Sequence, residues 1–185
     1  MPKRRPLRCL LGRGQIRRRV RELAEQIERD YQGCQLVLLG TLKGSFVFLS
    51  DLMRRLRLPV EVDFVGVSSY GLGQESSGQV SVYHSPRLEL RGRHVLLVED
   101  IVDTGLTAAY LTRLLRARRP ASLVICTLLD KRARRIAPNL PLAYVGFEVP
   151  DRFVVGYGLD YRQLYRNLPY IGVLRDELLS PGDPP

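Results

Sequence analysis

Histidine and cysteine are scarce in this chain of 185 residues, and tryptophan is absent. With only His84 and His94 present, a histidine-based catalytic triad or metal cluster is not expected. The cysteines Cys9, Cys34 and Cys126 are odd in number and lie far apart. They form no CxxC pair, which argues against a disulfide framework or a zinc site. This cysteine usage suits a reducing environment and predicts a cytoplasmic protein.

Long apolar runs are also missing. No stretch approaches the roughly 18 residues that span a bilayer. After the basic N-terminus only Cys9-Leu10-Leu11 is apolar before polar residues resume, so neither an export signal nor a membrane partner is expected. Hydrophobic residues make up 45% of the chain and charged residues 26%, which is typical of a globular protein. The length predicts one domain with a sizeable core.

Acidic residues are absent from the first 21 positions, which hold nine of the 29 Lys and Arg residues. The remaining 20 basic residues are nearly balanced by 19 acidic ones, so the net charge of +10 is a local feature. Such a segment is compatible with contact to RNA or to an acidic partner, or with a role in solubility. No aromatic residues are interleaved as a base-stacking platform requires, so solubility is favoured and nucleic acid is not an expected partner.

The hydrophobic pattern alternates between helical and strand spacing. Helices are predicted over 15–31, 45–56 and 108–118, and strands over 35–39, 60–67, 80–83, 95–98, 123–128 and 143–147. This alternation implies parallel crossovers and an α/β fold, an open, mainly parallel twisted sheet with helices on both faces. We expect a basic, partly loose arm over 1–14, a single domain over 15–178 and a disordered tail over 179–185.

Residues 95–107 (VLLVEDIVDTGLT) carry the most functional information. The apolar tetrad that opens this segment predicts a buried parallel strand, and helical spacing follows its end. Between the two, Gly105 permits a tight turn, Thr104 and Thr107 supply hydroxyls, and a helix start presents free amide donors. These features predict a cradle for a phosphate monoester.

Two adjacent carboxylates, Glu99 and Asp100, follow the predicted strand. Unpaired carboxylates about 5 Å apart repel by roughly 3 kcal/mol at an effective dielectric near 20. Such a pair therefore needs hydroxyl donors or a cation between its members. A sugar diol beside the phosphate supplies the donors, and Mg²⁺ is a suitable counter-charge. An isolated Glu-Asp pair would indicate a solvated acidic turn. The pair together with the strand and the glycine turn indicates a binding site for a ribose 5-phosphate.

Further motifs accompany this segment in a fixed order. They are LGTLKGSF at 39–46, VSSYG at 67–71, LLDK at 128–131, and VGFEVPD at 145–151 continuing to Asp160-Tyr161. With 95–107, these motifs resemble the type I phosphoribosyltransferases. Over about 15–174 they resemble the short, bacterial-like hypoxanthine-guanine phosphoribosyltransferases. The resemblance implies a lid at about 69–85 and a small hood built from the N-terminal segment and about 150–174.

The resemblance also implies a binding site for phosphoribosyl pyrophosphate (PRPP). Glu99 and Asp100 would hold the ribose hydroxyls and, through water, Mg²⁺. The 5-phosphate would be bound by the backbone amides and hydroxyls of Asp103, Thr104, Gly105, Leu106 and Thr107.

The leaving pyrophosphate has its own implied contacts. Arg166 is either one of them or a member of a surface ion pair. Sequence does not decide whether the peptide before Lys43 is cis. Ser69 and Tyr70 would close over the site. The backbone amides that would bind pyrophosphate are those of Leu42, Lys43 and Gly44.

At the purine end, the resemblance places Asp103 near N7 as a general base, or as the carboxylate that stabilises the N7 proton. Asp103 could also cap the following helix. Lys131 would donate to O6 and select 6-oxopurines over 6-aminopurines. Phe153 would stack on the base, and the backbone of Val154 would read its edge. Asp160 would lie near the base or a second Mg²⁺.

The implied reaction transfers phosphoribose from PRPP to N9 of hypoxanthine or guanine. It gives IMP or GMP and pyrophosphate, a purine salvage step, in a homodimer or homotetramer. One alternative is a regulator with this fold that binds nucleotides or RNA without turnover. Another is a transferase for xanthine or a pyrimidine. The residues Glu99, Asp100, Asp103 and Lys131 argue against the regulator. Lys131 together with 147–151 favours a purine, and xanthine stays open as a secondary substrate.

Overall fold

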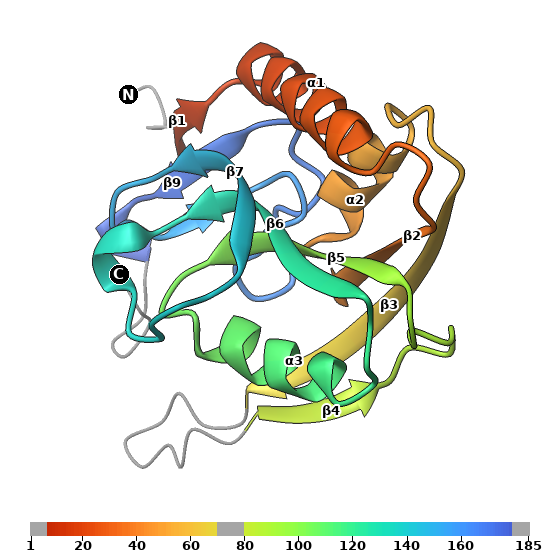
Figure 1. The fold of residues 1–185 in the computed structure, drawn as a ribbon. Coiled ribbons are helices and arrows are strands. Elements are labelled where there is room, and N and C mark those ends of the chain that lie inside the picture. Colours follow the sequence, from red (N-terminus) through yellow and green to blue (C-terminus); the bar gives the residue numbers. More distant parts are fainter. Residues whose placement is uncertain (1–6, 70–79, 179–185) are drawn as a thin grey trace.

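The structure, a computed structural model, describes residues 7–69 and 80–178 of the chain (Figure 1). Two 3-10 turns, η1 (Arg132–Arg134) and η2 (Asp176–Leu178), accompany the helices and strands. The other elements are, in chain order, β1 (Leu7–Leu11), α1 (Arg13–Asp30), β2 (Leu36–Leu42), α2 (Phe46–Met53), β3 (Val60–Ser69), β4 (Val80–His84), β5 (His94–Val102), α3 (Leu106–Arg116), β6 (Ser122–Asp130), β7 (Leu142–Glu148), β8 (Val154–Val155) and β9 (Ile171–Leu174).

The main sheet has six strands in the order β4-β3-β2-β5-β6-β7. Neighbouring strands from β3 to β7 pair in parallel, and β4 joins β3 antiparallel at the edge. Helices α1 and α2 lie on one face of the sheet and α3 lies on the other (Figure 1). The predicted fold class is therefore confirmed.

Burial on both faces explains why the central strands are apolar without interruption. In β2, Leu36 and Leu38 pack into the core beneath α1 and α2. The intervening Val37 and Leu39 pack into the core beneath α3. Because successive side chains of a strand point to opposite faces, a sheet covered on both sides needs apolar residues at every position.

Several element boundaries differ from those expected. Helix α2 ends at Met53 rather than 56, because the amides of Arg55 and Leu56 bond three residues back, to Leu52 and Met53, in a tighter turn. Strand β5 runs past 98 to Val102, because ladder pairing with β6 continues through the acidic pair. The carboxylates therefore belong to the strand itself rather than to the loop beyond it.

A second, three-stranded sheet joins the two ends of the described chain in the order β1-β9-β8. The structure thus differs from the loose arm expected over 1–14, because Leu7 pairs with Leu174 and Leu11 is buried. The partner strand is far away in sequence, so local periodicity does not reveal the pairing. Residues 1–6 and 179–185 lie outside the described residues. Within the described part, no helix is long and apolar enough to cross a membrane.

Candidate active site

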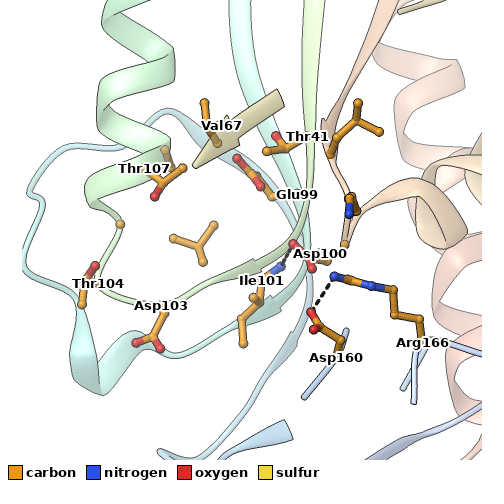
Figure 2. Close-up of a pocket in the computed structure, with 16 residues that line it drawn as sticks. Thr41, Val67, Glu99, Asp100, Ile101, Asp103, Thr104, Thr107, Asp160 and Arg166 are labelled. Atoms are coloured by element: carbon orange, nitrogen blue, oxygen red, sulfur yellow. Dashed lines mark hydrogen bonds and ion pairs between the residues drawn. The ribbon is translucent and has the colours of Figure 1, made fainter. Parts of the chain in front are cut away.

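A cavity of about 340 Å³ opens at the carboxyl ends of β2 and β5, where ligands bind in open α/β sheets (Figure 2). Most of the residues selected from the sequence meet here. Those that line the cavity are Leu42, Lys43, Gly44, Glu99, Asp100, Asp103, Thr104, Gly105, Thr107, Asp160 and Arg166. Motifs separated by more than 100 residues thus form one wall, because parallel strands deliver their ends to the same edge.

Four of the proposed residues are not among those that line the cavity: Leu106, Lys131, Phe153 and Val154. Leu106 points outward and is 49% exposed. The proposed lid contacts are not tested, because Tyr70 and the side chain of Ser69 lie outside the described residues.

The acidic pair sits in a setting that disfavours charge. Glu99 is buried, and burial followed by the neighbouring Asp100 charge raises its pKa to about 8. Burial likewise raises the pKa of Asp100 to about 6. Oε1 of Glu99 has no hydrogen-bond partner among the described residues. Two adjacent carboxylates with an unpaired buried oxygen fit a cation that retains water ligands, as Mg²⁺ does.

These shifts predict how stability depends on pH. The pKa of Glu99 is higher in the folded than in the unfolded protein, so the folded state holds a proton that the unfolded state releases above about 4.5. Stability should therefore fall as the pH rises from about 5 to about 8. With EDTA present, we expect the melting temperature of the natural protein to fall more steeply over this range than that of Glu99→Gln. Parallel curves for the two proteins would contradict the shift.

The loop after β2 approaches the acidic pair closely. The Leu42–Lys43 peptide is cis, the point that the sequence left open. A Cβ at Gly44 would lie 1.6 Å from Oδ2 of Asp100. The hydroxyl and the amide of Ser45 both donate to the carbonyl oxygen of Thr41, at 2.7 and 3.3 Å. The backbone of this loop therefore presents itself to the cavity with no side chain at Gly44.

The turn before α3 forms the opposite wall. Gly105 has φ 81°, the left-handed region that favours glycine, and it is the N-cap of α3. The expectation that Asp103 caps this helix is therefore wrong. The amides of Ile136 and Ala137 donate to the carbonyl oxygen of Thr104, which fixes the turn. Helix α3 has no acidic residue in its first turn, and the amide of its first residue, Leu106, donates to Oγ1 of Thr104 at 3.5 Å. The start of a helix is a setting that favours an anion.

Arg166 and Asp160 form an ion pair in the cavity wall, with Nη2 and Oδ1 2.7 Å apart (Figure 2). Nη1 of Arg166 also donates to the carbonyl oxygen of Gly158 at 2.7 Å. The second carboxylate oxygen of Asp160 accepts from the amide of Gln163. Arg166 is thus both an ion-pair member and a cavity residue, which leaves its proposed contact with pyrophosphate open.

Lys131 lies next to the cavity rather than in its wall. It is only 4% exposed, and its Nζ is 3.5 Å from Oδ2 of Asp103 and 3.5 Å from Oδ1 of Asp151. Phe153 packs edge-on against Tyr161, with ring centroids 5.4 Å apart.

Sequence reasoning did not assign six residues of this region. Arg134 forms an ion pair with Asp103. The other five line the cavity: Thr41, Val67, Ile101, Val102 and Ala108. Arg134 lies in the basic run KRARR directly after β6, and this run was the available signal. The η1 turn determines which arginine of this run lies next to Asp103. The residue types alone do not identify that arginine.

Known proteins resemble the chain in sequence and in structure. Residues 11–162 match the family described as phosphoribosyl transferase domain. The hypoxanthine phosphoribosyltransferase of Haemophilus influenzae is 48% identical over 166 residues, covering 88% of this chain and 92% of the relative. A crystal structure of a Staphylococcus aureus hypoxanthine phosphoribosyltransferase has a TM-score of 0.90 at 47% identity, over 95% of this chain and 96% of that one. A Bacillus anthracis hypoxanthine-guanine phosphoribosyltransferase structure with HEPES in the active site has a TM-score of 0.86 at 43% identity. The match covers 91% of this chain and 98% of that one.

Proposed function

The chain belongs to the phosphoribosyl transferase family, and from this premise we propose that the cavity at the carboxyl ends of β2 and β5 binds PRPP. The protein is a purine salvage enzyme, a hypoxanthine-guanine phosphoribosyltransferase that transfers phosphoribose from PRPP to the base. The observation that carries the assignment of the cavity is the meeting of an acidic pair and a helix-start phosphate cradle in one cavity.

Each wall of the cavity has chemistry suited to one part of PRPP. Amides at the start of α3, with the hydroxyls of Thr104 and Thr107, suit the 5-phosphate. Glu99 and Asp100 suit the ribose hydroxyls. The backbone at Lys43 and Gly44 suits the pyrophosphate, with Arg166 alongside. Product IMP or GMP would keep the sugar contacts after pyrophosphate leaves.

We assign Mg²⁺ to the acidic pair, with Asp160 nearby. The described residues contain no group of three acidic, histidine or cysteine side chains able to hold a metal by themselves. This fits an ion that is held by one or two carboxylates together with substrate oxygens. When bound, Mg²⁺ neutralises charge on the departing pyrophosphate.

The residues around the base would orient it for attack on C1 of the ribose. Cleavage there builds positive charge on the sugar ring, as in other glycosyl transfers. Asp103 would accept or stabilise the proton at N7 of the purine while N9 attacks. Lys131 would donate to O6, with Phe153 and the Val154 backbone against the ring. Fixing both reactants in one cavity replaces a bimolecular encounter and excludes water.

A spectrophotometric assay with PRPP and Mg²⁺ tests this proposal. Hypoxanthine, guanine, xanthine and adenine are offered separately. We expect nucleotide from hypoxanthine and guanine but none from adenine, because a fixed ammonium donor faces an amino group unfavourably. Equal turnover of adenine would remove Lys131 from its role. No turnover with any base, from folded protein, would overturn the assignment of the cavity.

Two further proposals concern the setting of the enzyme. We place it in the cytoplasm, where its three free cysteines would stay reduced. We expect a homodimer or homotetramer, which light scattering distinguishes.

A further inference from the structure

Four charged side chains form a closed ring beside the cavity. Lys131 lies 3.5 Å from Asp103 and 3.5 Å from Asp151. Arg134 contacts the same two carboxylates, with Nε 3.2 Å from Oδ1 of Asp103 and Nη1 3.5 Å from Oδ1 of Asp151. Each cation therefore touches both anions, and each anion touches both cations.

The ring joins three segments whose backbones are tied together. The amide of Lys131 donates to the carbonyl oxygen of Val102, at the end of β5. The amide of Val149 donates to the carbonyl oxygen of Asp130, at the end of β6. These two hydrogen bonds tie the backbone beside Asp103, Lys131 and Asp151 to the ends of β5 and β6.

The two cations of the ring differ in setting. The Lys131 side chain is 5% exposed and that of Arg134 is 26% exposed. Nη1 of Arg134 and Oδ1 of Asp103 are buried atoms without a hydrogen bond among the described residues, so their contacts are ion pairs that leave hydrogen-bonding capacity unused. Lys131 is the cation assigned to the purine oxygen, whereas Arg134 has no part in the proposed reaction.

We propose that Arg134 is a positioning residue for Asp103. When the Lys131 ammonium turns towards the purine oxygen, its ion pairs with Asp103 and Asp151 weaken. The Arg134 guanidinium, which is always charged and presents a planar set of donors, keeps both carboxylates compensated and holds Asp103 at the base. This inference rests on the proposed function, since it needs Asp103 and Lys131 to act on a purine.

The test is a double-mutant cycle on the full chain, with kcat and KM measured for hypoxanthine. We expect Arg134→Gln to lower kcat by about tenfold and to change KM for hypoxanthine by less than about twofold. In the Asp103→Asn background, the same change should cost less than about twofold, because the residue it positions is already inactive. Arg134→Lys should recover part of the lost rate.

Arg132→Gln is the matched control, because Arg132 lies in the same turn but is exposed. It should keep kcat and the melting temperature of the natural protein. A loss from Arg134→Gln that is equal in both backgrounds, or no loss in the natural background, would overturn the inference. A natural protein that turns over no base would instead overturn the proposed function itself, so the two failures are distinguishable.

Discussion

Asp103→Ala should lower kcat at least about tenfold with the fold intact. Asp103 lines the cavity and belongs to the ring of charges, and it is the carboxylate that we propose to lie at N7 of the purine. Alanine removes the group that we propose to accept or stabilise the proton as the base becomes a nucleophile. It also leaves Lys131 and Arg134 with Asp151 as their shared carboxylate, so the two cations should repel and shift.

Two measurements separate these effects. Steady-state kinetics with hypoxanthine and PRPP give kcat, and circular dichroism with thermal melting reports the fold. Asp103→Asn keeps the shape but not the charge, and we expect it to lose most of the same activity. Near-normal turnover by the alanine variant would remove Asp103 from the role assigned to it.

Gly44→Ala should lower kcat/KM for PRPP by about 100-fold or more. The substitution displaces the backbone proposed to bind pyrophosphate, or the Asp100 carboxylate proposed to bind the ribose, and both must be in position for PRPP to react. A Cβ at this position would lie 1.6 Å from Oδ2 and 2.5 Å from Cγ of Asp100. The Asp100 carboxylate accepts a hydrogen bond from the amide of Ile101, which limits its escape. Either the loop or the carboxylate must therefore move away from the positions that we propose for the sugar and the pyrophosphate. Overpacking of this kind also costs about 1–3 kcal/mol of stability.

Gly14→Ala serves as the control for this substitution. Gly14 lies in α1, and a Cβ there would meet nothing within 4 Å. We expect unchanged kinetics and an unchanged or slightly higher melting temperature, because alanine has a higher helix propensity than glycine. If Gly44→Ala bound PRPP as tightly as the natural protein in a calorimetric titration, the close approach of this loop to Asp100 would not matter for PRPP binding.

The residues around the acidic pair show which structural features the local sequence predicts. Val95 to Val98 are apolar without interruption, and this pattern alone indicates a strand covered on both faces. The turn chemistry at Gly105 is equally local, because a left-handed residue at a helix start favours glycine. The fold class and the glycine turn before α3 were therefore predictable from residues that are neighbours in the chain.

Other features arise only between distant segments. The pairing of Leu7 with Leu174 joins two ends of the chain, and nothing in residues 1–14 alone indicates it. The contact of Arg134 with Asp103 depends on which side of a short turn one arginine occupies. The raised pKa of Glu99 depends first on burial, which the assembled sheet supplies.

By itself, the sequence determined the alternation of strands and helices, the glycine turn and the acidic pair, because each depends on spacing and backbone preference within about a dozen residues. The tertiary structure decided the cavity, the approach of Gly44 to Asp100 and the ring of charges around Asp103. These require side chains from separate strand ends to reach one place, and parallel pairing brings those ends to the same edge of the sheet.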